Sequence, residues 1–271
     1  KSTIANLIPR FYDTTEGTVR IYGEDVRSYT LDSLRQVIGV VPQNVALFEE
    51  LTVRENIDFF CALYVDDRRE RARLVDEAIA FVGLEDYVKF RPRKLSGGLL
   101  RRLNIACGIA HKPELIFFDE PTVAVDPQSR NAILEGIRRM NAQGCTVVYT
   151  SHYMEEVEEI CSRIMIMDRG RSVAVGTNVE LKALVGAGER IIVEVAALGD
   201  AVRGRLASLP HVRRVTYTEP ELVVQCEQGG HNVGDVLGVL ADAGCAVGRV
   251  YAEPPTLNDV FLEITGKELR D

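Results

Sequence analysis

The sequence predicts an α/β protein of two domains: a layered domain over residues 1–186 and a smaller α+β domain over residues 187–271. Up to about residue 186, short apolar runs alternate with longer helical patterns, which is typical of helices packed on both faces of a sheet. Near residues 186–188 the order of elements changes to strand, helix, strand, strand, helix, strand. A length of 271 residues is enough for each part to bury its own core.

The strands of the first domain are predicted by apolar runs that are too short for helices. The segment 115–118 is the clearest, because four apolar residues are followed directly by Asp119 and Glu120. A hairpin is expected around the turn Asp168-Arg169-Gly170. The strands expected in this domain are residues 38–41, 115–118, 146–149, 163–167 and 172–175.

The helices of the first domain are predicted by apolar residues spaced three and four apart. In residues 68–82, Leu74, Ala78 and Val82 fall on one face, and charged residues lie on the opposite one. Further helices are expected after Thr3 and over residues 99–110, 131–140 and 153–160, of which the last is acidic.

The second domain has the element order of a ferredoxin-like fold, β-α-β-β-α-β. Its two middle strands are joined by a short turn at residues 218–220, and an amphipathic helix at 257–264 closes the chain after Pro254 and Pro255. The strands are expected at residues 190–196, 211–217, 221–226 and 247–251, and the helices at 200–208 and 233–243.

Composition excludes several classes of protein. An apolar fraction of 46% with 27% charged residues is ordinary for a folded domain and excludes a disordered chain. The formal net charge of −8 disfavours general binding to nucleic acid, where lysine and arginine neutralise phosphates. No apolar run reaches the length of a membrane helix, so contact with a membrane is expected only through a partner. The six scattered cysteines have no zinc-like spacing and are expected to be reduced thiols packed as small apolar residues.

The first residues, Lys1-Ser2-Thr3, match the last positions of the phosphate-binding motif G-x-x-x-x-G-K-[ST] and one residue beyond. In that motif the lysine ammonium meets the β- and γ-phosphates, and the following hydroxyl is a ligand of Mg²⁺. The glycines of the motif would precede Lys1, and no signal peptide is visible. We therefore expect the true start of the protein to lie upstream, so that this sequence begins inside the motif.

Two carboxylates follow the predicted strand 115–118. Polar residues at the carboxyl end of a buried strand lie at the sheet edge where open α/β sheets bind ligands. Asp119 is placed to hold Mg²⁺ through its water shell. Glu120 is placed to orient or deprotonate an attacking water. In isolation, the same two acids also fit an ordinary strand end that meets solvent.

The segment Leu95-Ser96-Gly97-Gly98 stands directly before a predicted helix. Ser96 is a suitable N-cap, and the two glycines leave bare backbone N–H groups at the positive end of the helix. Such an end favours an anion, although these residues alone also fit a plain capped helix start.

Together with Asp126 and His152, these segments resemble the ATP-binding cassette (ABC) ATPases in order and spacing, over about residues 1–186. The resemblance implies a P-loop NTPase-type cassette with a helical subdomain that carries the signature sequence. Gln43, in Val41-Pro42-Gln43, resembles the glutamine of the Q-loop, which reaches Mg²⁺ and the attacking water. Asp126 matches the D-loop at the dimer interface, and His152 matches the switch histidine that contacts the γ-phosphate.

The resemblance further implies that two cassettes close face to face around ATP and Mg²⁺, as a homodimer or a paired cassette. The residues expected to bind ATP are Lys1, Ser2, Thr3, Ser96, Gly97, Gly98 and Asp126. The expected metal ligands are Ser2, Gln43 and Asp119, and the expected catalytic residues are Glu120, His152 and Gln43.

Departures from the common pattern point to a branch of the family. Leu99 stands where the signature usually has glutamine, and Val123 stands where the D-loop usually has a small polar residue. These features, with residues 101–106 and 255–262, resemble the ABC-2 type exporters of drugs and polymers, whereas residues 4–13 look more like a fused exporter. The ABC-2 resemblance implies a separate transmembrane permease that contacts residues 43–57, on the cytoplasmic face of the cell membrane.

Other functions stay open at this point. The missing glycines are compatible with a non-catalytic or regulatory nucleotide-binding module, in which case the fragment alone would be inactive. DNA-repair ATPases share the Leu-Ser-Gly-Gly helix but need coiled coils and basic surfaces, and translation factors carry two cassettes in one chain. The second domain fits a structural or dimerisation element, or a ligand sensor. The other histidines, His111, His211 and His231, fit no site and are expected at the surface.

Overall fold

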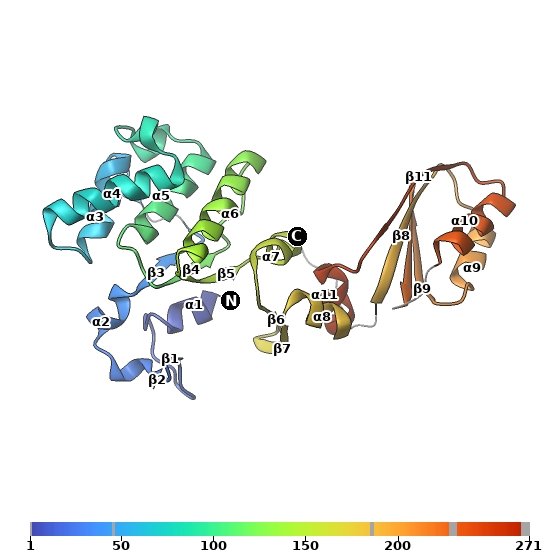
Figure 1. The fold of residues 1–271 in the computed structure, drawn as a ribbon, viewed down its shortest axis with the longest axis horizontal. Coiled ribbons are helices and arrows are strands. Elements are labelled where there is room, and N and C mark those ends of the chain that lie inside the picture. Colours follow the sequence, from blue (N-terminus) through green and yellow to red (C-terminus); the bar gives the residue numbers. More distant parts are fainter. Residues whose placement is uncertain (1, 45–46, 185–186, 228–231, 267–271) are drawn as a thin grey trace. The chain divides into compact units, whose positions relative to one another are not determined.

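The computed structural model describes residues 2–44, 47–184, 187–227 and 232–266 and divides the chain into two compact units, Lys1–Glu156 and Val157–Asp271 (Figure 1). This division falls earlier than the expected domain boundary at residues 186/187. The reason is packing: the hairpin of β6 (Ile164–Asp168) and β7 (Arg171–Gly176) is followed by α8 (Asn178–Leu184), which packs against both β7 and the closing helix α11 (Leu257–Thr265). A domain boundary at residues 186/187 stays a prediction.

The first unit contains a parallel sheet of three strands in the order β3 (Ile38–Val41), β4 (Leu115–Asp119) and β5 (Thr146–Thr150). All three strands were predicted from the sequence. Four of the five residues of the central strand β4 are buried because both faces are covered, and Phe117 and Phe118 are at most 1% exposed. The register pairs Asp119 with Thr150, so the polar ends of β4 and β5 lie at the same edge of the sheet.

The N-terminal segment packs on this sheet through short elements. A small core unites Ala5, Val26, Leu34, Ile38 and Phe117. These residues come from α1, from the segment before β3, and from β3 and β4 themselves, so α1 is held against β4. The elements are α1 (Ser2–Leu7), the antiparallel pair β1 (Arg20–Ile21) and β2 (Glu24–Asp25), and α2 (Leu31–Gln36).

Three helices pack together beside the sheet: α3 (Val53–Ala62), α4 (Arg68–Val82) and α5 (Gly97–Ile109). The limits of α4 follow from its caps, because the side chain of Asp67 accepts from the N–H of Glu70 and Gly83 ends the helix at φ 67°. Helix α6 (Pro127–Ala142) packs between α5 and β5, and α7 (Met154–Ile160) follows β5.

Helix α5 approaches strand β3 very closely. A Cβ on Gly39 would lie 2.7 Å from the carbonyl oxygen of Gly108, and a Cβ on Gly108 would lie 2.7 Å from Val41 Cγ2. Only glycine fits at both positions, so the two elements meet backbone to backbone. This contact brings α5 next to the residues that follow β3.

Within the second unit, residues 187–253 have the predicted β-α-β-β-α-β order, with sheet order β11-β8-β10-β9 and antiparallel pairing throughout. This arrangement is the ferredoxin-like topology. The elements are β8 (Ala187–Val195), α9 (Asp200–Ala207), β9 (Val212–Thr218), β10 (Glu221–Glu227), α10 (Val233–Asp242) and β11 (Val247–Glu253).

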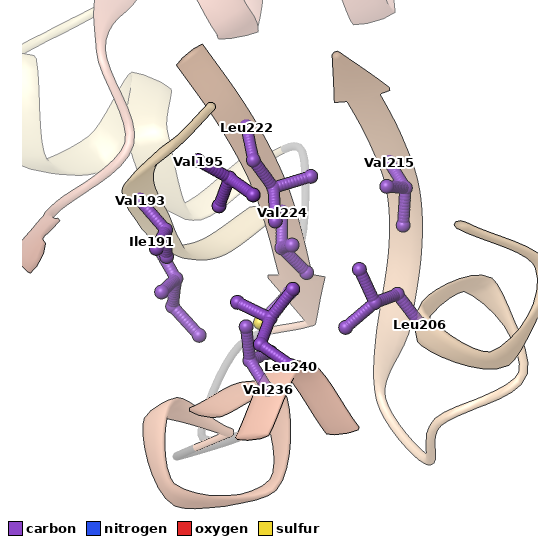
Figure 2. Close-up of a cluster of buried hydrophobic side chains, with 10 residues drawn as sticks. Ile191, Val193, Val195, Leu206, Val215, Leu222, Val224, Val236 and Leu240 are labelled. Carbon is purple, nitrogen blue, oxygen red and sulfur yellow. The ribbon is translucent and has the colours of Figure 1, made fainter. Parts of the chain in front are cut away.

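The core of this unit lies between one face of the sheet and the two helices α9 and α10 (Figure 2). Alternate residues of the strands point into it, as the period of two requires: Ile191 and Val193 on β8, and Leu222 on β10. The helices contribute Leu206 and Leu240. All five side chains are fully buried.

The structure corrects one expectation about the histidines and supports another. The ring of His111 is half-buried and stacks on Tyr64 with a centroid distance of 3.9 Å, so the expected surface position was wrong. Burial lowers the pKa of His111 to about 4. His211 is exposed, as expected, and His231 lies outside the described residues.

The six cysteines are free thiols, as expected from their spacing. Cys61, Cys107 and Cys226 are buried, and burial raises the pKa of the Cys61 thiol to about 11. They pack as small apolar residues. Within the described residues, no helix combines the length and the apolar character that crossing a bilayer requires.

Candidate functional site

The carboxyl edge of the parallel sheet carries the predicted acidic residues. Asp119, the last residue of β4, is 8% exposed, and the hydroxyl of Thr150 on β5 donates to its Oδ1 atom at 2.6 Å. This bond follows from the register, which places the two residues side by side. The hydroxyl donor fixes the orientation of this carboxylate.

Glu120 and His152 meet just beyond the same edge. Each follows a strand end, and the Nδ1 atom of His152 lies 2.8 Å from Oε2 of Glu120. The side chain of Glu120 is 13% exposed and that of His152 is 39% exposed, so the carboxylate is sheltered while the imidazole reaches solvent. With a proton on Nδ1, the imidazole donates to Glu120 and its tautomer is fixed.

The backbone of Glu120 is held in an uncommon conformation. Its φ angle is 51°, in the left-handed region, which costs free energy for a residue with a side chain. The N–H of Glu120 lies within hydrogen-bonding distance of both the carbonyl and the hydroxyl oxygen of Thr150, at 3.1 and 3.2 Å. The turn after β4 is therefore fixed by β5, and it directs the Glu120 carboxylate toward His152.

Gln43 reaches this site through its backbone. Its carbonyl oxygen and that of Pro42 accept hydrogen bonds from Arg101 on α5, at 2.8 and 2.9 Å. The same guanidinium also binds carbonyls of the turn at Glu120. Gln43 itself is exposed, two residues after the end of β3.

The Ser96–Gly98 segment forms a second cluster with Asp126. Ser96 caps α5 by accepting from the N–H of Leu99, and Asp126 caps α6 by accepting from the N–H of Ser129. A Cβ on Gly98 would lie 2.4 Å from Ser129 Oγ and 2.8 Å from Asp126 Oδ2. The start of α5 therefore packs directly on the start of α6, which places two helix N-termini side by side. Hydrogen bonds from Ser129 lower the pKa of Asp126.

Three predicted residues lie at the N-terminus. Lys1 lies outside the described residues, Ser2 begins α1, and Thr3 is exposed in its first turn. The structure thus brings together Asp119, Glu120 and His152 and links the Gln43 backbone to them. It joins the Ser96–Gly98 segment to Asp126 through Gly98 in a second cluster.

Sequence reasoning missed a buried carboxylate next to His152. Glu156 on α7 is 0% exposed, and one of its oxygens accepts from the hydroxyls of Thr122, Tyr149 and Ser151 at 2.8, 2.5 and 3.2 Å. Its other oxygen pairs with Arg130 at 2.6 Å. Glu156 lies on α7 among other acidic residues, and its burial depends on partners from distant segments, so helical periodicity gives no signal for it.

The donor set at the sheet edge suits a hard cation more than a transition metal. The carboxylate of Asp119 and the amide oxygen that Gln43 offers are oxygen ligands of the kind that Mg²⁺ takes. Within the described residues, no group of three or more histidine, cysteine, aspartate or glutamate side chains forms a metal cage. Such a site fits a cation that is completed by phosphate oxygens and water.

Two family models match the chain. One, described as "ABC transporter", matches residues 1–123, and the other, described as "ATP-binding protein DrrA1-3-like, C-terminal domain", matches residues 176–265.

Several curated proteins are similar to the whole chain. The linearmycin resistance ATP-binding protein LnrL of Bacillus subtilis is 38% identical over 100% of this chain and 88% of its own length. The Nod factor export ATP-binding protein I of Rhizobium meliloti is 34% identical over 100% of this chain and 78% of its own length. The daunorubicin resistance ATP-binding protein DrrA3 of Streptomyces coeruleorubidus is 34% identical over 100% of this chain and 85% of its own length.

Solved structures show the same fold. An ATP-binding subunit of an ABC transporter superposes with a TM-score of 0.62 at 25% identity, over 69% of this chain and 77% of that chain. A dimeric ATP-binding cassette in a post-hydrolysis state, with bound ADP and Pi, superposes with a TM-score of 0.59 at 28% identity, over 65% of this chain and 79% of that chain.

Proposed function

The chain belongs to the family of ABC transporter ATP-binding proteins, and on this premise we propose that it binds and hydrolyses ATP to drive an exporter. The observation that carries the hydrolytic part is the pair of Glu120 and His152, whose side chains meet at 2.8 Å beside Asp119. A sheltered carboxylate next to an imidazole is a suitable arrangement for handling the proton of an attacking water.

The proposed reaction is transfer of the γ-phosphoryl group to water. The water oxygen forms a bond to the γ-phosphorus, the bond to the β-phosphate oxygen breaks, and Glu120 orients the water and accepts its proton. His152, held by Glu120, is the second polar group at the reacting phosphate. This chemistry depends mainly on positioning and charge stabilisation, which a rigid sheet edge supplies.

Asp119 and Gln43 are the described residues proposed to hold Mg²⁺, with Ser2 as a further ligand. Bound there, Mg²⁺ would neutralise phosphate charge. The orientation of Asp119 by the Thr150 hydroxyl prepares the carboxylate for this role, because one oxygen is already fixed.

The Ser96-Gly97-Gly98 segment is proposed to bind the ATP held mainly by a second cassette. The thirteen-residue helix α5 begins there, and its N-terminal N–H groups favour the negative charge of a triphosphate. Asp126, packed against Gly98, is proposed to lie at the interface between the two cassettes. Lys1, Ser2 and Thr3 are proposed to bind the ATP held by the same chain.

A membrane permease is the proposed transport partner. The family relatives named above are named for linearmycin resistance, Nod factor export and daunorubicin resistance, which supports an export role. A place on the cytoplasmic face of the membrane is part of the same proposal. An aromatic cluster within and just after residues 43–57 supports a docking surface, since Phe48 and Phe59 are 43% and 42% exposed with ring centroids 4.6 Å apart. The buried side chain of Asn56 holds this loop through hydrogen bonds to Phe48 and Leu51.

Phosphate release from Mg²⁺-ATP tests the proposal, with the protein expressed from its complete reading frame. We expect steady hydrolysis by the wild type and a loss of at least about 100-fold for Glu120→Gln. Glu120→Gln keeps the shape of the side chain and ATP binding, and light scattering should show an ATP-bound dimer. Glu155→Gln, at an exposed neighbouring acid, is the matched control. Full turnover by Glu120→Gln would remove Glu120 from its role, and a wild type without turnover would overturn the hydrolytic function.

A further inference from the structure

Arg101 is a buried cation whose hydrogen bonds go to backbone carbonyls. It lies on α5, is 4% exposed, and was not among the residues predicted to act at the site. A guanidinium has five N–H bonds in a rigid planar fork. Each of the five has one carbonyl acceptor here, so the donor capacity of Arg101 is fully used.

The five acceptors come from two loops. Nη1 donates to Pro42 and Gln43 at 2.9 and 2.8 Å. Nη2 donates to Asp119 and Glu120 at 3.1 and 2.8 Å, and Nε donates to Pro121 at 2.8 Å. One side chain thus joins the loop that bears Gln43 to the turn that bears Asp119 and Glu120.

The bonds to the second loop surround the strained residue. Glu120 has a φ angle of 51°, and Arg101 binds its carbonyl and the carbonyls on either side. A left-handed conformation persists only where surrounding contacts determine it. On the other loop, Asn104 adds a hydrogen bond to the Pro42 carbonyl at 3.2 Å, one turn further along α5.

The helix that supplies Arg101 begins at the Ser96–Gly98 segment. Its close contact with β3 through Gly39 and Gly108 sets the separation that lets the guanidinium reach both loops. A movement of α5 would therefore act directly on the carbonyls beside Gln43 and Glu120. Lysine, with three N–H bonds on one nitrogen, has neither the number nor the spread of donors to replace this fork.

We propose that Arg101 is a positioning residue for ATP hydrolysis, which fixes the backbones of the Gln43 and Glu120 loops relative to each other and to the signature helix α5. This inference rests on the proposed function. Arg101 does not touch the nucleotide in this proposal, so its loss lowers kcat and leaves the affinity for ATP nearly unchanged.

The test compares Arg101→Met, Arg101→Lys and the control Leu103→Ala in the protein expressed from its complete reading frame. Leu103 is 0% exposed on the same helix, so its truncation destabilises α5 without removing a loop hydrogen bond. For each variant, kcat and the Kd of Mg²⁺-ATP are measured at a temperature well below its Tm. Amide hydrogen exchange is followed at the N–H groups of residues 43–44, 119–120 and 122–123.

We expect Arg101→Met to lose at least about tenfold in kcat with a Kd within about threefold of wild type, and to exchange faster in both loops. Arg101→Lys should recover part of the kcat, and Leu103→Ala should lower Tm without a comparable loss of kcat. Wild-type kcat and exchange in Arg101→Met would overturn the proposal, as would an equal kcat loss in Leu103→Ala.

Two further results are decisive. If Arg101→Met does not fold, Arg101→Lys carries the test, and wild-type kcat and exchange in that variant overturn the proposal. If the wild type hydrolyses no ATP, the proposed function fails, while the exchange measurement still decides whether Arg101 joins the two loops.

Discussion

The Nδ1 atom of His152 lies 2.8 Å from Oε2 of Glu120, although 32 positions separate the two residues in the sequence. The parallel pairing of β4 with β5 creates this contact, because it places Asp119 opposite Thr150 and both strands end at the same edge of the sheet. The contact is therefore as rigid as the sheet that supports it.

A double-mutant cycle on this pair should show strong coupling. We expect His152→Ala to lower kcat by about 10- to 1,000-fold, because the imidazole orients Glu120 and contributes to the reacting site. The variant with both Glu120→Gln and His152→Ala should be no more than about threefold slower than Glu120→Gln alone, since groups that act as a unit are not additive. Single-turnover phosphate release measures the rates.

The matched control for that cycle is His211→Ala, which removes an exposed imidazole from the second unit. It should leave the rates unchanged alone and in combination with Glu120→Gln. Independent, multiplying losses from Glu120→Gln and His152→Ala would show that the two side chains do not act together.

The sheet edge could be predicted from the sequence because its signals are local. A run of apolar residues ending in Asp119 and Glu120 identifies a buried strand and its polar end without knowledge of the rest of the chain. The ferredoxin-like order could also be predicted, since the alternation seen at Ile191 and Val193 on β8 repeats at Leu222 and Val224 on β10.

The supporting residues could not be found in this way. Arg101 and Glu156 are charged residues in amphipathic helices, where a charge normally lies at the surface. Their burial depends on carbonyls and hydroxyls supplied by distant segments, such as Pro42 for Arg101 and Thr122 for Glu156. The short elements β1 and β2 were missed because strands of two residues leave no period to detect.

Glu156→Gln should destabilise the first unit. Glutamine keeps the shape but removes the charge that pairs with Arg130, and its amide group cannot accept from the three hydroxyls in the same way. Breaking one partner of a buried pair costs about 3–5 kcal/mol. Arg130 is 32% exposed and recovers some hydration, so we expect a loss of about 2–3 kcal/mol in the free energy of unfolding.

Urea unfolding measures this loss, with Glu155→Gln as the control. Glu155 is the adjacent, exposed residue of the same helix, and its substitution should change stability by less than about 0.5 kcal/mol. Equal stabilities for the two variants would show that the buried network around Glu156 contributes little.

Gly98→Ala should disturb the contact between the two helix starts. The added Cβ would lie 2.4 Å from Ser129 Oγ and 2.8 Å from Asp126 Oδ2, so the cap of α6 has to shift. We expect a cost of about 1–3 kcal/mol in stability, as for other overpacked sites. Gly97→Ala is the comparison for stability, because the nearest atom to its Cβ would be the Ala124 carbonyl at 4.0 Å. Thermal unfolding should show a lower Tm for Gly98→Ala but not for Gly97→Ala. Equal Tm values for the two variants would mean that the contact between the helix starts adjusts to the added Cβ without a loss of stability.

The stability of the first unit should depend on pH through His111. Burial against Tyr64 lowers the pKa of His111 from 6.5 to about 4, so the folded state holds the neutral ring while the unfolded state takes up a proton first. The unfolded state then binds more protons between these values, and stability rises with pH. The contribution is complete above pH 6.5 and is lost as pH falls toward 4; it amounts to about 2 kcal/mol between pH 7 and pH 5.

His111→Phe isolates this effect, because phenylalanine keeps a flat ring against Tyr64 but has no nitrogen to titrate. Urea unfolding gives the decrease in the free energy of unfolding from pH 7 to pH 5. We expect this decrease to be about 2 kcal/mol smaller in His111→Phe than in the wild type. His211→Gln, which removes an exposed imidazole, should keep the wild-type dependence. If His111→Phe shows the same pH dependence as the wild type, the lower stability in acid comes from other groups. Titration of the buried His111 ring predicts instead that the variant loses this part of the pH dependence.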